Sequence, residues 1–146
     1  MKLQVSSRLA VFALLALAAD PARQLSVAEI CDKYGISGHH LAKVMHILGR
    51  AGLVQSVRGA GGGYQFSGNA RRTTLLDVIQ LFEKLGSGHS RSEAGDRTSE
   101  GRALREIVDE IDDIVRATLG SITIGTMLKL VSRRRAPSRR SLAAVS

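Results

Sequence analysis

The chain has 146 residues, a formal net charge of +8 and an isoelectric point near 10.6. This length fits one domain, or one domain with an appended helix, and is enough to bury a hydrophobic core. The basic excess favours a polyanionic partner over an acidic-ligand carrier. The single cysteine, Cys31, excludes an intrachain disulfide and an all-cysteine metal site, as is typical of a reduced intracellular protein.

The charge is distributed unevenly along the chain. Residues 1–74 hold nine Lys or Arg against three Asp or Glu, and residues 120–146 hold six Lys or Arg and no acid. Residues 75–119 are acidic, with ten Asp or Glu against six Lys or Arg. We therefore expect the N-terminal half to meet a polyanion, and the middle of the chain to avoid phosphate.

The first predicted element is a helix from about Ser6 to Ala19, which ends before Asp20-Pro21. Its apolar run with a basic flank also resembles a secretory signal peptide. However, Arg8 directly abuts the run, which is shorter than the roughly 20 residues that span a bilayer. A buried first helix is therefore preferred, and no transmembrane segment is predicted. A secreted basic protein stays open as an alternative.

Two short amphipathic helices follow. The sequence Ser26-Val-Ala-Glu29 predicts a capping box at the start of the second helix, and Gly35 ends that helix. Ser37 is expected to cap the third helix, and Gly52 to close it in a left-handed conformation. The apolar residues of the third helix recur at helical spacing: Leu41, Val44, Met45 and Leu48.

A hairpin is predicted next. Val54 and Val57 mark one short apolar run, Tyr64 and Phe66 mark another, and a glycine-rich loop carrying Arg58 joins them. The predicted order of helix, turn, helix and hairpin is that of a winged helix-turn-helix, within a mainly α fold that has a small β-hairpin wing. This order indicates DNA as the partner.

The third helix presents a row of polar side chains opposite its apolar face: His39, Lys43, His46 and Arg50. Such a row can enter a major groove, with its N-terminal members nearest the base edges. The candidates for base or groove-edge contact are Gly38, His39, His40 and Lys43. The candidates for phosphate contact are Ser37 and Arg50. An ordinary solvated helix face is the alternative interpretation.

Arg58 at the tip of the wing suits insertion into a narrow minor groove, where negative potential is concentrated. Gly59 and Gly61 would let backbone amides approach phosphate. A nucleotide-binding loop is disfavoured, because the known glycine-rich patterns need a helix straight after the loop, and here Tyr64 begins a strand. A purely structural hairpin stays open.

No catalytic or metal site is predicted, so the chain is not expected to be an enzyme or to carry a cofactor. His39 and His40 are neighbours on a helix and point about 100° apart, which prevents good chelation of one ion. Cys31 is interpreted as a small buried hydrophobe. His89 stands alone in a glycine- and serine-rich loop.

The C-terminal half predicts a fourth helix over about Thr74–Lys84 and a long helix from Glu100. The long helix carries an apolar seam suited to a partner helix, although packing within its own domain is the alternative. A short helix or turn is expected over Ser121–Leu130, followed by a disordered basic tail that includes Arg133–Arg140. The expected organisation is as follows: DNA-binding domain 1–85, flexible loop 86–99, dimerisation helix and short terminal helix 100–131, and basic disordered tail 132–146.

Three motifs resemble the Rrf2 family of bacterial transcription regulators, of the IscR/NsrR type. They are Ser37-Gly-His-His-Leu-Ala-Lys-Val-Met, Leu48-Gly-Arg-Ala-Gly-Leu-Val and Ser56-Val-Arg-Gly-Ala-Gly-Gly-Gly-Tyr64. The resemblance covers about residues 1–131. It implies a homodimer formed by crossed long helices, with the third helix in the major groove and Arg58 in the minor groove.

The resemblance also shows a departure. Many family members hold an iron–sulfur cluster through three cysteines before the long helix, but residues 86–101 contain none. The position of an acidic fourth ligand corresponds to Arg8. The chain thus resembles a member without the cluster. We expect a cytoplasmic, dimeric, DNA-binding repressor with an unknown effector, and a winged-helix protein–protein interaction module is the alternative.

Overall fold

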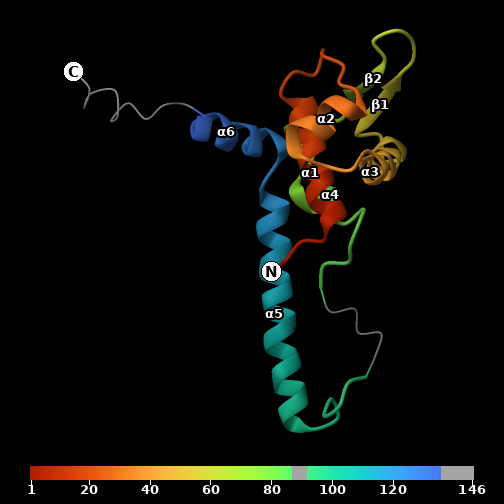
Figure 1. Ribbon diagram of the computed structural model, residues 1–146. Coiled ribbons are helices and arrows are strands. Elements are labelled where there is room, and N and C mark those ends of the chain that lie inside the picture. Colours follow the sequence, from red (N-terminus) through yellow and green to blue (C-terminus); the bar gives the residue numbers. More distant parts are fainter. Residues whose placement is uncertain (87–91, 136–146) are drawn as a thin grey trace, which may run out of the picture.

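A computed structural model describes residues 1–86 and 92–135. Helices α1 to α4 and a β-hairpin form a head, from which α5 projects as a long rod (Figure 1). The mainly helical fold with a hairpin wing confirms the predicted fold class. The elements are α1 Val5–Ala18, α2 Val27–Tyr34, α3 Gly38–Arg50, β1 Val54–Val57, β2 Gly63–Phe66, α4 Leu75–Ile79, α5 Ser99–Ser121 and α6 Ile124–Arg135.

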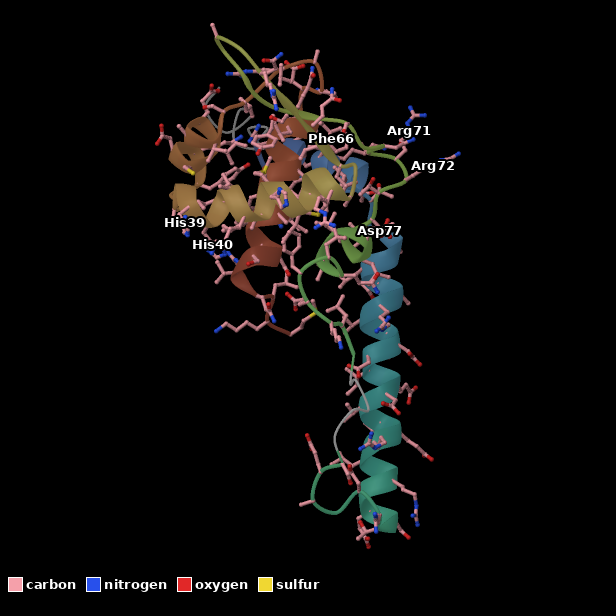
Figure 2. All side chains as sticks on the ribbon, turned by 90° about the vertical axis from the view of Figure 1, so that its right-hand side faces the viewer. His39, His40, Phe66, Arg71, Arg72 and Asp77 are labelled. Carbon is pink, nitrogen blue, oxygen red and sulfur yellow. The ribbon has the colours of Figure 1, made fainter. Side chains whose placement is uncertain are left out.

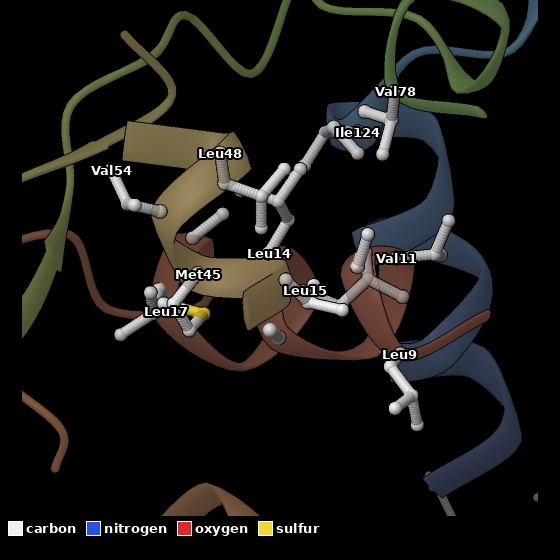
Figure 3. Packing of buried hydrophobic residues seen from close by; sticks show 14 of the residues in the cluster. Leu9, Val11, Leu14, Leu15, Leu17, Met45, Leu48, Val54, Val78 and Ile124 are labelled. Atoms are coloured by element: carbon white, nitrogen blue, oxygen red, sulfur yellow. The ribbon is translucent and has the colours of Figure 1, made fainter. Parts of the chain in front are cut away.

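Helix α1 is the centre of the core. Leu14 and Leu17 are fully buried, and alanines along the helix let its neighbours approach closely. Leu48 packs near Leu14 from α3, while α4 and α6 contribute Val78 and Ile124 (Figure 3). The prediction of a buried first helix is therefore confirmed. Within residues 1–86 and 92–135, no helix is long and apolar enough to cross a membrane.

The turn between α2 and α3 forms as the glycine pattern predicts. Gly35 takes a left-handed conformation with φ of 66°, which a side chain would disfavour. At the start of α2 the Ser26 hydroxyl accepts from the Glu29 amide at 3.1 Å. The Glu29 carboxylate accepts from that same hydroxyl at 3.4 Å. In the expected capping box it would accept from the Ser26 backbone amide, so only one half of the box forms as predicted. Ser37 occupies the N-cap position of α3, but its side chain makes no capping bond, which corrects that prediction.

The hairpin pairs β1 and β2 antiparallel, with Val54 opposite Phe66 and Val57 opposite Gly63. The segment before α2 adds a short third edge, because Leu25 and Tyr64 exchange backbone hydrogen bonds of 2.9 and 2.7 Å. A Cβ on Gly63 would collide with the Leu25 backbone, so glycine is required there. The hairpin and the loop 58–62 between its strands are called the wing below.

Helix α4 is shorter than predicted, because the expected helix to Lys84 ends at Ile79. A complete capping box between Thr74 and Asp77 starts it. After α4 the chain turns so that the Glu83 carboxylate reaches the N-terminus of α1. There it accepts from the Gln4 amide at 2.9 Å and from the buried Ser7 hydroxyl at 2.5 Å. This long-range contact explains the early end of α4.

Replacing Glu83 by alanine is expected to destabilise the fold by about 1–3 kcal/mol, because the buried Ser7 hydroxyl loses its acceptor. The α1 N-terminus also loses a favourable negative charge. Urea unfolding followed by circular dichroism would measure the change as a lower midpoint at constant slope. Glu106→Ala, which removes an exposed carboxylate on α5, should leave the midpoint unchanged. Equal midpoints for the two variants would contradict the capping role.

Helix α6 extends further than predicted. It is helical through Arg135, so the first four residues of the expected disordered tail, 132–135, belong to a helix. The remaining tail and His89 lie outside the described residues. The α5–α6 junction is bonded to residues 70–75, which lead into α4. The Leu75 amide donates to the Ile122 carbonyl, the Ile124 amide to the Thr73 carbonyl and the Gly125 amide to the Ala70 carbonyl, at 2.8–2.9 Å.

Candidate nucleic-acid interface

One face of α3 is exposed and polar, and the opposite face is buried. The exposed side chains are His39, Lys43, His46 and Arg50, which are called the α3 row below. Leu41, Val44 and Leu48 on the other face are buried at 0–1% exposure. Helix α3 runs along the front of the head, with His39 at its N-terminal end (Figure 2). The periodicity of the sequence therefore predicted correctly which side chains meet solvent.

His40 differs from its neighbour in environment. It is half-buried, and its Nε2 lies 3.0 Å from the Ser6 hydroxyl of α1. This contact fixes the N-terminal end of α3 against the core. Ser37 and Gly38 are exposed at the same end, and the Ser37 hydroxyl is free of a capping bond. The end of α3 thus offers a hydroxyl and exposed backbone together.

The wing lies beside the C-terminal half of α3. A groove of about 350 Å³ separates the two and is lined by His46 and Arg50 on one side and Gln55 and Tyr64 on the other. Arg58 is exposed at the far end of β1. The loop after it turns through Gly59 and Gly61, with φ of 113° and 78°, a left-handed range that favours glycine. The candidate DNA-contacting residues of α3 and of the wing therefore lie on neighbouring elements of one head.

Two exposed arginines were not among the predicted site residues. Arg71 and Arg72 follow the hairpin, in a turn where the Asn69 side chain accepts from the Arg71 amide at 3.0 Å. They project from the head at the end opposite His39 (Figure 2). A search for adjacent basic residues after the wing would have found them.

The geometry defines a class of protein. A helix-turn-helix with a hairpin wing places exposed basic side chains on α3 and at the wing tip, and residues 1–74 carry three acids in all. This is the arrangement of a DNA-binding transcription regulator. The chain belongs to the Rrf2 family, described as "Iron-dependent Transcriptional regulator", whose pattern it matches over residues 3–130.

The relatives agree with this assignment, and they are regulators rather than enzymes. A Rhodopseudomonas palustris protein described as "Putative HTH-type transcriptional regulator BadM" is 47% identical over 140 residues, covering 96% of this chain and 89% of the relative. The T. potens IscR structure is 26% identical with a TM-score of 0.76, over 97% of this chain and 96% of that one. The structure of CymR, "the Global Cysteine Regulator of B. subtilis", is 28% identical with a TM-score of 0.74, over 89% and 98%.

The family description raises the question of iron. Cys31 is the single cysteine of the sequence, so one chain cannot supply three thiolates. In the two described ranges, no three His, Cys, Asp or Glu side chains come together where they could hold a metal ion. Arg8, at the position of an acidic ligand in the resemblance, instead lies 5.5 Å from the centre of the Phe12 ring. These residues do not fit a cluster held by three cysteines, so the function proposed below uses no iron.

Proposed function

We propose that the protein is a cytoplasmic repressor that binds its operator as a homodimer. The cytoplasm follows from the function, because a bacterial transcription regulator acts where its DNA is. The α3 row enters the major groove, and Arg58 enters the adjacent minor groove. The observation that carries the proposal is the exposed basic surface formed by α3 and the wing on one head. A protein bound in this way represses by occluding a promoter.

The roles of the site residues follow from their positions. The N-terminal end of a recognition helix lies nearest the base edges, so that groove-edge contacts are assigned to Gly38, His39, His40 and Lys43. Ser37, with its uncapped hydroxyl, and Arg50, beside the wing, are assigned to phosphate. The amides of Gly59 and Gly61 approach the backbone next to the Arg58 contact.

The proposal of a dimer rests on the exposed apolar side chains of the long helix α5. Helix α5 has no buried residue, and one side of it carries a row of exposed apolar side chains: Leu104 (66% exposed), Ile107 (57%), Val108 (40%), Ile111 (54%) and Ile114 (59%). Spacings of three and four residues place these side chains in one stripe, called the α5 stripe below. A stripe of this length on a projecting helix suits the same stripe of a second copy.

The function is tested by fluorescence anisotropy of the purified protein with the duplex upstream of its own gene and with a shuffled duplex. A preference of about a thousandfold for the native duplex, across a salt series, is the expected result. Equal and steeply salt-dependent affinities would show backbone attraction alone and contradict a specific operator in that duplex. Weak affinity without salt dependence would favour the protein-interaction module instead.

Replacing Lys43 by alanine is expected to weaken operator binding by about 1–3 kcal/mol if the ammonium group reads a base. If the ammonium group meets a phosphate instead, the slope of log affinity against log salt falls by about one. Anisotropy titrations at several salt concentrations separate the two outcomes. Lys84→Ala is the matched control, because Lys84 is also exposed but follows α4. Losses of the same size in both variants would remove Lys43 from the interface.

A further inference from the structure

A cavity of about 380 Å³ lies between α1, α2 and α6. Helix α6 is on the opposite side of the head from α3, so the cavity is separate from the DNA-reading surface (Figure 1). Its volume falls in the range of small-molecule sites, about 300–1,000 Å³. The proposed contacts with DNA use none of the residues that line it.

The inner wall of this cavity is apolar. The rings of Phe12 and Tyr34 are stacked, with centroids 5.2 Å apart and planes 14° from parallel. Helix α6 supplies the facing aliphatic and thioether side chains: Met127, Leu128 and Val131. Such walls favour a ligand with an apolar body.

The other lining groups are cationic or hydrogen-bonding. Lys33 and Arg135 line the cavity together with Ser132 and the Tyr34 ring, and no Asp or Glu lines it. Within the described part of the chain neither cation forms an ion pair, although the Lys33 ammonium lies 5.4 Å from the centre of the Tyr34 ring. Burial raises the pKa of the Tyr34 phenol and Arg135 acts to lower it, so that the phenol stays protonated at neutral pH and can donate. These groups complement an anion.

We propose that this cavity binds a small monocarboxylic acid with an apolar aliphatic or aromatic body. The body lies against Phe12, Tyr34 and the α6 side chains, and the carboxylate lies between Lys33 and Arg135. A carboxylate there relieves the repulsion between two cations that share a cavity without an acid. It also accepts hydrogen bonds from the guanidinium group.

The cavity connects to the recognition helix through α2, and this step rests on the proposed DNA-binding function. Tyr34 is the last residue of α2, and Gly35 and Ile36 lead directly to Ser37 at the start of α3. The Ile36 amide bonds to the Cys31 carbonyl at 3.1 Å, so the turn is tied to α2. A ligand that shifts the end of α2 therefore shifts the end of α3 that meets the base edges. The acid acts as an effector of DNA binding.

Isothermal titration calorimetry of the full chain tests the site without DNA. The probes are hexanoate, octanoate, phenylacetate and 3-phenylpropionate, with 3-phenylpropionamide as the neutral counterpart. We expect at least one acid to bind with a Kd below about 1 mM, and the amide to bind at least tenfold more weakly than its acid. Absence of binding by all four acids, or equal binding of acid and amide, would overturn the proposal.

Substitutions locate the binding. The double variant Lys33→Gln with Arg135→Gln keeps much of each stem and should lower acid affinity at least tenfold. Arg134→Gln is the matched control, because Arg134 is the neighbouring exposed arginine and does not line the cavity. Circular dichroism checks that both variants fold. Equal affinities of the double variant and the control would place the acid elsewhere and overturn the site.

The effector role has its own measurement. Anisotropy with the operator duplex is repeated with the protein saturated by the acid, and operator affinity is expected to change at least fivefold. Acid binding with unchanged operator affinity would overturn the effector role and leave DNA binding intact. Loss of operator specificity without any acid would instead contradict the proposed function, so the two failures are distinguishable.

Discussion

Replacing Ile111 by glutamate is expected to convert the proposed dimer into monomers and to weaken operator binding by about 100-fold or more. Ile111 lies in the middle of the α5 stripe and is 54% exposed in the single chain. In the proposed dimer its side chain is buried against the partner stripe, where a carboxylate would be desolvated without a cation. When two linked heads bind two half-sites, the first contact raises the effective concentration of the second head at its half-site. This gain in affinity is lost when the α5 helices separate.

Sedimentation equilibrium and anisotropy with the operator duplex check this expectation on the same samples. Arg102→Glu is the matched control, because it introduces the same carboxylate at an exposed position of α5, about 180° around the helix from Ile111. It should remain dimeric and bind as the parent does. A dimeric Ile111→Glu variant with full operator affinity would show that the α5 stripe is not the interface.

The second large effect is expected at the wing. Replacing Arg58 by alanine should weaken operator binding by about 10- to 100-fold, or ~1–3 kcal/mol, and relax the preference for A·T pairs under the wing. Arg58 is exposed beside a loop whose glycines, Gly59 and Gly61, take left-handed conformations. A narrow minor groove attracts a guanidinium group more than a wide one, so the loss should depend on sequence.

Anisotropy with the native operator and with a version carrying G·C pairs under the wing measures both parts of this prediction. Arg58→Lys keeps the charge but loses the planar guanidinium group, and lysine is the more strongly hydrated cation. It should restore part of the affinity and little of the A·T preference. Unchanged affinity and unchanged sequence preference in Arg58→Ala would remove the wing from the proposed mechanism.

Local patterns in the sequence were sufficient to predict the helix-turn-helix and the hairpin. The exposed and buried faces of α3 follow from periodicity, the α2–α3 turn follows from Gly35, and the hairpin follows from glycines between two apolar runs. In each case the partners lie within a few residues, so a single sequence contains the signal. The family resemblance added the expectation of a homodimer formed by crossed long helices.

Contacts between distant segments account for two features that the sequence did not predict, whereas the length of α6 was missed for a local reason. The early end of α4 depends on Glu83 reaching Gln4 and Ser7 at the start of the chain. The length of α6 was underestimated because its terminal arginines were interpreted as a tail, although basic residues favour a helix C-terminus. The cavity between α1, α2 and α6 joins two N-terminal helices to the last described helix of the chain, and no local pattern specifies it.

The hydrogen-bonded junction between α5 and α6 holds the long helix α5 at a fixed angle to the head. Because Ile122, Ile124 and Gly125 are hydrogen-bonded to residues 70–75 at the start of α4, the direction in which the rod leaves the head is set within one chain. In the proposed dimer this direction determines how far apart two recognition helices stand. Substitutions on α3 can then change the bases that are preferred while the half-site separation stays the same. Base preference and operator spacing are thus two traits that can evolve independently.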